Sequence, residues 1–299
     1  MEKINGILAL QILGMISPAQ FQEELTRCIA NALREDVGPG DYSSLACIPD
    51  SANGAAKLVV KEAGIIAGVE FAKQIFNYVD AELQLDLFIQ DGTAVVPGDI
   101  VFHVRGSAQS ILKAERVVLN SMQRMSAIAT KTKSYVELIA GTGTQLLDTR
   151  KTTPNFRAPE KWAVHIGGGA NHRFALYDMI MLKDNHLDFA GGIARAIEKT
   201  KAYLQANQLD LKIIVEARNL QEVEEILQAG GIYRILLDNF DFETTRKAVA
   251  RIGNACLTES SGNINEQTLR DYAECGVNYI SSGALTHSVY NLDLSLKAL

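Results

Sequence analysis

The sequence predicts an α/β protein of two parts: an N-terminal α/β sandwich domain over residues 1–115, followed by an incomplete, open TIM-like α/β barrel over residues 116–299. Two observations support this fold class. In the second part, short apolar runs alternate with amphipathic helices, which is typical of a parallel sheet covered by helices. The apolar runs also end in polar side chains, as do the strands of a barrel that share one site.

Composition and charge exclude several classes of protein. The 299 residues are 47% hydrophobic and 21% charged, so the chain can bury a sizeable core. A formal net charge of −6 argues against a nucleic-acid partner, which would need a basic face. The four cysteines form no CxxC pair, so we expect neither a zinc site nor a disulfide framework, and we predict a cytoplasmic protein with reduced thiols.

An apolar segment, GILALQILGMI, lies near the first residue, at positions 6–16. It is too short to span a bilayer. It also lacks the basic region of a signal peptide, because Glu2 offsets Lys3. We therefore expect an N-terminal helix or a loosely attached extension, and no membrane partner.

The first part is predicted to combine helices with short strands. Phe21, Leu25, Ile29 and Leu33 recur every four residues, which indicates a helix that ends at the glycines and proline of DVGPGDYSS. Strand-like runs follow, with a further helix among them; the runs cover residues 55–63, 64–71 and 83–106, and the helix covers residues 71–79.

From Ile111 to about Gly141 the chain is predicted to be helical, across the boundary between the two parts. Apolar runs then predict buried parallel strands at residues 144–151, 178–185, 212–217, 234–239, 255–260 and 278–285. Amphipathic helices are predicted between them, at residues 191–204, 219–230, 241–252 and 265–276. This alternation fits either a TIM-like barrel or an open doubly wound sheet.

Polar side chains at the ends of all the predicted strands favour the barrel. They are Arg150 and Lys151, Lys183 and Asp184, Glu216, Asp238, Glu259 and Ser260, and Ser281 and Ser282. In a barrel such carboxyl ends converge on one site, whereas in an open sheet only the strands beside the switch point contribute. Eight strands are not visible, so the barrel is predicted to be incomplete.

Cations gather around the first of these strand ends in an otherwise acidic chain. Arg150, Lys151, Arg173 and Lys183 have the chemistry to bind carboxylates or phosphates. His172 could add a hydrogen-bond donor whose charge changes near neutral pH. The sequence therefore predicts a site for a multiply charged anion.

Two carboxylates complete the predicted site. Glu216 and Asp238 follow successive strands and could hold Mg²⁺ or accept hydrogen bonds from sugar hydroxyls. The glycine run at residues 167–169 could let backbone N–H groups approach an anion, or could simply form a tight turn. Arg157 and Lys161 are interpreted as charges of an outer loop.

Other chemistries stay open at this point. Lys183 in a buried strand could form a Schiff base, as in aldolase barrels. Residues 91–106 resemble the strand–turn pattern of lipoyl- or biotin-carrier folds, but no exposed lysine lies at the hairpin tip. Neither a GxxxxGK phosphate-binding loop nor a dinucleotide-binding GxGxxG motif is present.

Nine short motifs follow one another between about Ile29 and Ser288. They are REDVGPGDYSS, ERVVLN, DTRKTTPNFR, EKWAVHIGGGANHR, KDNH, VEA, LLDN, ESSGNI and YISSGALTHS. In this order they closely resemble the motifs of the quinolinate phosphoribosyltransferase family. The spacing of the DTRKTTP, GGGANHR and KDNH blocks is highly specific, whereas the first sixteen or so residues have no match.

The resemblance implies a reaction, a fold and an assembly. The family converts quinolinate and 5-phosphoribosyl-1-diphosphate into nicotinate mononucleotide, CO₂ and diphosphate, with Mg²⁺ required, in NAD biosynthesis. The implied fold is an α/β sandwich followed by an open α/β barrel. The implied assembly is a homodimer, or a set of dimers, in which the N-terminal domain of one subunit covers the barrel mouth of another.

The resemblance also implies roles for individual residues. Arg150, His172, Arg173 and Lys183 match the positions that bind the two quinolinate carboxylates. Arg116, in the ERVVLN motif, matches an arginine that enters the neighbouring subunit's site.

The phosphoribosyl side of the implied site uses a second set of residues. Lys151 and Lys183 match lysines that contact the phosphoribosyl diphosphate, and Glu216 and Asp238 match the acidic pair near the ribose hydroxyls and Mg²⁺. These four are the implied catalytic residues. The loops implied to hold the 5′-phosphate contain Ser261, Gly262, Ser282 and Gly283.

Two positions depart from the family pattern. Asn155 and Asn263 stand where the family commonly has glycine. The change at Asn263 could alter one backbone contact to phosphate, although asparagine adopts left-handed backbone more readily than most residues. A relative that uses another aromatic acid, such as nicotinate, or one linked to molybdenum transport, would share the phosphate residues, but the pair Arg150 and Arg173 favours a dicarboxylate.

Overall fold

The computed structural model describes residues 16–299, so the predicted N-terminal helix or extension lies outside the described residues apart from Ile16. The chain forms two compact units. The first consists of Met1–Ser134, Lys151–Gly168 and Leu285–Leu299, and the second of Tyr135–Arg150 and Gly169–Ala284. The chain therefore passes between the two units more than once. The predicted boundary between two domains at residue 115 stays a prediction.

An antiparallel sheet of four strands forms part of the first unit, in the order β12-β1-β5-β3. Its strands are β1 (Asn53–Val60), β3 (Gln84–Leu87), β5 (Ile100–Ser107) and β12 (Leu294–Ala298). Alternate residues such as Leu58, Val60, Phe102 and Val104 are buried, as expected for a sheet with one face in the core. A smaller sheet pairs β2 (Gly64–Ile65) with β4 (Ala94–Val95).

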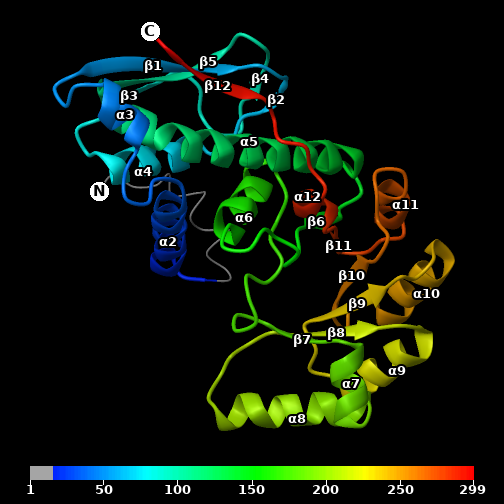
Figure 1. Cartoon of the computed structure of the whole chain (residues 1–299). Coiled ribbons are helices and arrows are strands. Elements are labelled where there is room, and N and C mark those ends of the chain that lie inside the picture. Colours follow the sequence, from blue (N-terminus) through cyan, green and yellow to red (C-terminus); the bar gives the residue numbers. More distant parts are fainter. Residues whose placement is uncertain (1–15) are drawn as a thin grey trace. The chain divides into compact units, whose positions relative to one another are not determined.

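Within the described residues, six helices lie wholly or mostly in the first unit. They are α2 (Pro18–Asp36), α3 (Tyr42–Cys47), α4 (Val69–Val79), α5 (Ala108–Leu138), α6 (Arg157–Ile166) and α12 (Ala284–His287), with the ends of α5 and α12 at the unit boundary. α5 runs along the four-stranded sheet (Figure 1). It is tied to the β2 segment because Ser126 Oγ accepts a hydrogen bond from the backbone N–H of Ala67 at 2.9 Å.

The predicted helices of the first part are confirmed. α2 begins with a capping box, in which Ser17 Oγ accepts from Gln20 N–H and Gln20 Oε1 accepts from Ser17 N–H. Both α4 and the long α5 lie where the sequence places them. The strand-like run at 64–71 is wrong in extent, because only Gly64–Ile65 is strand and helix α4 begins at Val69.

The second unit contains a parallel sheet of six strands, in the order β6-β11-β10-β9-β8-β7. The strands are β6 (Gln145–Leu147), β7 (Ile180–Leu182), β8 (Ile213–Ala217), β9 (Arg234–Asp238), β10 (Leu257–Ser261) and β11 (Tyr279–Ser281). Their helices are α7 (Asp184–Ala190), α8 (Ile193–Ala206), α9 (Leu220–Ala229), α10 (Phe242–Ile252) and α11 (Leu269–Ala273).

The strand order decides between the two architectures that the sequence left open. β7 to β11 are neighbours in chain order, and the first strand, β6, lies beside the last, β11. A doubly wound sheet reverses direction at a switch point, whereas a barrel keeps winding one way until its last strand meets its first. Within the described residues no ladder joins β6 to β7, so the barrel is open there, and the predicted incomplete barrel is confirmed.

The helix starts of the second unit follow from their capping residues. Asn219 and Asp241 accept hydrogen bonds from the N–H groups of Glu222 and Thr244, at 3.0 and 2.7 Å. The strands that these helices cover are nearly all buried, as β8 is along its whole length. This matches the continuous apolar runs of the sequence.

One interpretation of the charged segment is wrong. Lys161 is only 1% exposed, because residues 157–166 form helix α6 and not an outer loop. Its neighbour Glu160 is fully buried and accepts a hydrogen bond from Arg124 Nε at 3.0 Å. Pro159 lies in the first turn of α6, where the missing N–H group interrupts no helical hydrogen bond.

Candidate active site

Because the six strands of the second unit are parallel, their carboxyl ends lie at one edge of the sheet. Most of the predicted site residues follow those ends. Arg150 comes after β6, Lys183 after β7 and Ser282 and Gly283 after β11, while Glu216, Asp238 and Ser261 close β8, β9 and β10, followed by Gly262. The structure thus gathers these residues at one edge of one unit.

Two arginines of the second unit lie close together. Burial of the guanidinium lowers the pKa of Arg173, and the positive charge of Arg150 lowers it further. The negative charge of Asp178 raises it. Arg173 is 6% exposed and donates from Nη1 to the carbonyl of Met179 at 3.1 Å. The buried Nε of Arg150 has no hydrogen-bond acceptor among the described residues. Two adjacent guanidinium groups with an unused donor are suited to an anion with more than one negative charge.

Two carboxylates, one of them buried, fix the segment that carries His172 and Arg173. Asp148 is fully buried and accepts from Asn171 Nδ2 and from the N–H of His172, both at 2.7 Å. Asp178 accepts from the N–H groups that follow Arg173. We did not predict these two acids as site residues. The signal for Asp148 was a charged residue directly after the apolar pair Leu146 and Leu147, in LLDTR.

Lys183 and Glu216 form an ion pair in the second unit. Lys183 Nζ lies 3.7 Å from Glu216 Oε2, and the side chain of Glu216 is only 10% exposed. Burial raises the pKa of Glu216; Lys183 opposes this, while the charges of Asp238 and Asp184 raise the pKa further. The predicted pair of Glu216 and Asp238 therefore lies close enough to interact. Lys183 is half exposed and paired with a carboxylate, unlike the desolvated lysine that forms a Schiff base.

The loop after β10 needs glycine and asparagine at neighbouring positions. Gly262 has φ 93°, and a Cβ at this position would collide with the side chain of Asn239. Asn263 also has positive φ, 51°, and donates from Nδ2 to Asn239 Oδ1 at 3.1 Å. Asn155 has φ 63°. The expectation that asparagine supports left-handed backbone at both departures from the family pattern is confirmed.

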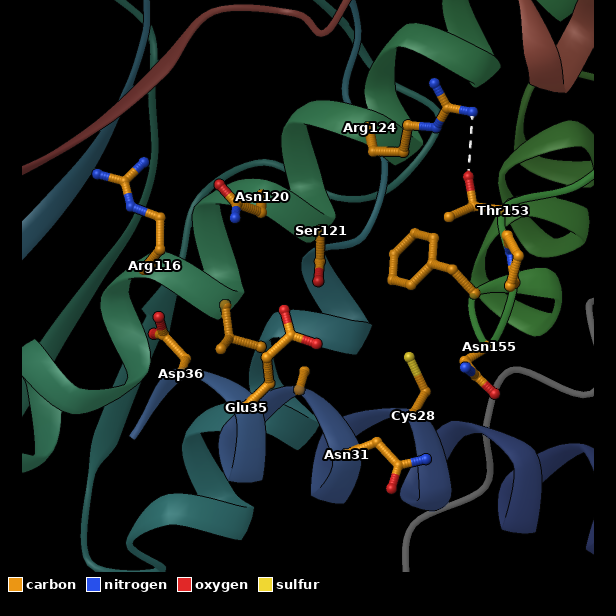
Figure 2. Close-up of a pocket in the computed structure, with 14 residues that line it drawn as sticks. Cys28, Asn31, Glu35, Asp36, Arg116, Asn120, Ser121, Arg124, Thr153 and Asn155 are labelled. Carbon is orange, nitrogen blue, oxygen red and sulfur yellow. Dashed lines mark hydrogen bonds between the residues drawn. The ribbon is translucent and has the colours of Figure 1, made fainter. Parts of the chain in front are cut away.

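The remaining predicted residues, Arg116 and Lys151, belong to the first unit. Arg116 lines a cavity of about 430 Å³ between α2, α5 and the segment Thr153–Phe156 (Figure 2). It lies on the same face of α5 as Asn120 and Arg124, since the three are spaced four residues apart. Within the described part of the chain, Arg124 is paired with Glu160, whereas Arg116 is exposed and forms no ion pair.

The first two residues of the glycine run, Gly167 and Gly168, form a turn, and Gly167 also packs closely against α5. The N–H groups of Gly167 and Gly168 donate to the carbonyls of Ala163 and His165, and so end α6. A Cβ at Gly167 would also lie 2.5 Å from the carbonyl oxygen of Ala129 on α5. The anion-binding alternative is therefore wrong for these two residues, because their N–H groups are already used.

Comparison with known proteins identifies the family. Two family models match the chain: "Quinolinate phosphoribosyl transferase, N-terminal domain" over residues 41–126 and "Quinolinate phosphoribosyl transferase, C-terminal domain" over residues 128–297. The chain belongs to the quinolinate phosphoribosyltransferase family. The resemblance noted in the sequence motifs is thereby confirmed.

Similar proteins of this family come from plants and bacteria. The chain is 44% identical over 295 residues to the chloroplastic nicotinate-nucleotide pyrophosphorylase [carboxylating] of Oryza sativa subsp. japonica, with 94% of this chain and 79% of the relative covered. It is 38% identical to the probable nicotinate-nucleotide pyrophosphorylase [carboxylating] of Bacillus subtilis, with 91% and 93% covered. The crystal structure of NadC from Streptococcus pyogenes superposes with a TM-score of 0.84 at 39% identity, covering 95% of this chain and 99% of that one.

The metal ion that the quinolinate phosphoribosyltransferase family implies can be tested against the side chains. Among residues 16–299, no three His, Cys, Asp or Glu side chains are grouped as a metal cage. Mg²⁺, however, is commonly held by one or two carboxylates together with substrate phosphates and water. Glu216 and Asp238 supply two carboxylates whose mutual repulsion a cation would relieve. The residues therefore fit a magnesium ion that arrives with a phosphorylated substrate.

Within residues 16–299, no helix combines the length and the apolar character needed to span a bilayer.

Proposed function

We propose that this protein transfers the phosphoribosyl group of 5-phosphoribosyl-1-diphosphate to quinolinate and releases CO₂ and diphosphate, with nicotinate mononucleotide as product. This is the reaction of a pentosyltransferase in NAD biosynthesis. The adjacent and partly buried Arg150 and Arg173 carry the proposal, because a dicarboxylate needs two cationic partners. The names of the relatives, nicotinate-nucleotide pyrophosphorylase [carboxylating], support the same reaction.

In the first step the ring nitrogen of quinolinate forms a bond to the anomeric carbon of the ribose, and the bond from that carbon to diphosphate breaks. The anomeric carbon becomes oxocarbenium-like as diphosphate leaves. Lys151 and Lys183 are proposed to stabilise the leaving negative charge, an effect that needs only preorganised cations. Arg150, His172 and Arg173, with Lys183, are proposed to hold the pyridine ring in line for the attack.

In the second step the carboxylate next to the ring nitrogen leaves as CO₂. The nitrogen is now cationic, so it stabilises the electron pair that stays on the ring carbon, and a proton then replaces the carboxylate. An arginine that binds this carboxylate loses a charged partner as CO₂ forms. The protein thus acts by charge binding and orientation, without a covalent intermediate.

Glu216 and Asp238 are proposed as the residues that hold Mg²⁺ or the ribose hydroxyls. The ion would neutralise part of the diphosphate charge. The loops with Ser261, Gly262, Ser282 and Gly283 are proposed to bind the 5′-phosphate. Their glycines let backbone N–H groups approach an anion closely.

A homodimer and a cytoplasmic location are part of the proposal. Arg116 is exposed on α5 and forms no ion pair within the described residues, which suits a side chain that completes the site of a neighbouring subunit. Some relatives are named chloroplastic or mitochondrial, so the named locations differ between relatives.

The direct test is an assay of the purified protein with quinolinate, 5-phosphoribosyl-1-diphosphate and Mg²⁺, beside an identical assay with nicotinate. We expect nicotinate mononucleotide and CO₂ from quinolinate only. Product from nicotinate without CO₂ would indicate a related transferase for a monocarboxylate. Borohydride trapping of a carbonyl substrate on Lys183 would indicate a Schiff-base enzyme instead.

A further inference from the structure

A buried cluster of charged side chains lies inside the second unit and takes no part in the proposed reaction. Glu259 of β10 is fully buried, and Arg234 of β9 is 5% exposed. Arg234 Nη1 donates to Glu259 Oε2 at 2.6 Å. In the register of β9 and β10, Arg234 is opposite Leu257, two residues before Glu259, so the two side chains share one face of the sheet.

Aromatic rings hold Arg234 in place. Its guanidinium carbon lies 4.0 Å from the ring centre of Tyr279 and 5.3 Å from that of Tyr233. Tyr279 is opposite Glu259 in the register of β10 and β11. Burying a charge pair is costly unless the surrounding groups fix its geometry. Cation–π contacts on two sides supply that constraint for the guanidinium.

The imidazole of His172 connects this cluster to the substrate site. Its Nε2 lies 3.3 Å from Glu259 Oε2, and its Nδ1 accepts a hydrogen bond from the backbone N–H of Arg173 at 2.7 Å. A nitrogen that accepts a hydrogen bond carries no proton, so the ring proton belongs on Nε2, facing the carboxylate. Both ring nitrogens of His172 therefore have partners inside the second unit.

The charge of Glu259 is matched to this arrangement. Burial alone would raise the pKa of Glu259, but His172 and Arg234, with a further contribution from Ser281, lower it to about 2. A carboxylate that stays ionised keeps a negative charge 3.3 Å from Nε2 and so favours the proton on that nitrogen. The imidazole then leaves its Nδ1 lone pair directed at the backbone of Arg173.

We propose that Glu259 is a positioning residue, with Arg234 as its counter-charge, which fixes the ring of His172 and through it the backbone of Arg173 for carboxylate binding. The proposal rests on the proposed function, in which Arg173 binds quinolinate. It gives His172 a second role, in addition to the part in substrate binding proposed above. The carboxylate of Glu259 acts on the ring, the ring acts on the Arg173 N–H, and the guanidinium is thereby placed beside Arg150.

Three variants test this proposal. Glu259→Gln keeps the shape but removes the charge, so it weakens the hold on His172 and leaves Arg234 without its partner. Glu259→Gln combined with Arg234→Met removes both charges, which avoids an unpaired buried cation if the single variant folds poorly. Ser260→Ala is the matched control: the neighbouring hydroxyl is also buried and has no hydrogen-bond partner among the described residues.

The kinetic readout separates positioning from general damage. In both Glu259 variants we expect the KM for quinolinate to rise by about tenfold or more, and the KM for 5-phosphoribosyl-1-diphosphate to change by less than about twofold. Ser260→Ala should match the wild type in both constants. A double variant with wild-type KM for quinolinate, or variants in which both KM values rise equally, would overturn the proposal.

A second readout does not depend on activity. Histidine labelled with ¹⁵N reports which ring nitrogen carries the proton, and the His172 signal can be assigned by its loss in His172→Asn. We expect the Nε2–H form in the wild type and a mixture of forms in Glu259→Gln. A wild-type ring protonated at Nδ1 alone would contradict the proposal. A protein with the expected ring signals but no nicotinate mononucleotide synthesis would instead reject the proposed function and leave the network intact.

Discussion

At the scale of single residues, the arginine pair is the most informative feature of the site. Arg150 and Arg173 repel each other, since the charge of Arg150 lowers the pKa of Arg173. A protein keeps two like charges close together only if a ligand offsets the repulsion or the surrounding contacts enforce it. The Met179 carbonyl and Asp178 hold Arg173, while the Nε donor of Arg150 is left for a ligand.

Replacement of Arg173 should therefore impair quinolinate use specifically. We expect Arg173→Ala to lower kcat/KM for quinolinate by an amount equivalent to about 2–5 kcal/mol, because a buried carboxylate would lose its partner. Arg173→Lys should retain part of the activity, since it keeps the charge but not the bidentate fork. Arg251→Ala, which removes an exposed arginine paired with Glu224, is the control. Wild-type kinetics in Arg173→Ala would reject the assignment.

Glu216 gives a prediction about stability. Burial raises its pKa above the ordinary value of 4.5, with Asp238 and Asp184 adding to the rise and Lys183 opposing it. Between 4.5 and the raised value the folded protein holds more protons than the unfolded chain, so wild-type stability falls as pH increases through this range. Glu216→Gln lacks this titration.

In metal-free buffer we therefore expect Glu216→Gln to be more stable than the wild type at neutral pH, by roughly 0.5–1 kcal/mol, while its activity falls. The difference should vanish below pH 4.5, where the unfolded carboxyl is also protonated. Urea unfolding at a series of pH values measures it, with the exposed Glu198→Gln as control. Equal stability of variant and wild type at every pH would contradict the cause assigned to the pKa.

The residues at strand ends were predictable, and those that support them were not. Arg150, Lys183, Glu216 and Asp238 were found because parallel strands bring their carboxyl ends together, a rule that needs only the strand pattern. Glu259 and Ser281 were noted as strand ends, but the buried side chains with which they interact were not predicted. Arg234 pairs with Glu259 across 25 residues of sequence, and local patterns carry no information about such a contact.

At the scale of elements, the loop after β10 depends on left-handed backbone. Asn263 has φ 51°, which β-branched residues rarely tolerate. We expect Asn263→Gly to keep wild-type activity, and Asn263→Val to raise the KM for 5-phosphoribosyl-1-diphosphate, as the strained loop would lose about 1–2 kcal/mol. The KM for quinolinate should stay unchanged in both. Equal effects of valine and glycine at this position would show that backbone conformation is not the reason for asparagine.

Elements with strong periodicity were predicted well, and short or distant ones were missed. β8 and β9 are apolar runs that only a buried parallel strand explains, and α2 shows a regular apolar stripe. The short helices α3 and α7 are too brief for periodicity to register. β12 was missed because its strand character depends on β1, with Leu296 opposite Leu58, far away in sequence. Such pairing is decided by tertiary contacts and not by local propensity.

At the scale of the whole molecule, the open question is whether one chain forms a complete site. Arg116 and Lys151 belong to the first compact unit, and the other predicted site residues belong to the second. If the protein is a dimer whose sites are shared, each site combines residues of two subunits. Variants of two such residues then damage different sites in a mixed dimer, which makes the arrangement measurable.

Arg116→Ala and Lys151→Ala are each expected to be inactive as pure proteins. The two variants can be unfolded, mixed in equal amounts and refolded, after which half of the dimers should be mixed. If Arg116 acts across the interface, one of the two sites in each mixed dimer has both residues intact. The mixture should then regain about one quarter of wild-type activity. If Arg116 serves its own subunit, every site in every dimer lacks one of the two residues and no activity returns. Mass spectrometry of differently tagged subunits confirms that mixed dimers have formed. A mixture that contains them and stays inactive would exclude a site in which Arg116 of one subunit acts together with Lys151 of the other.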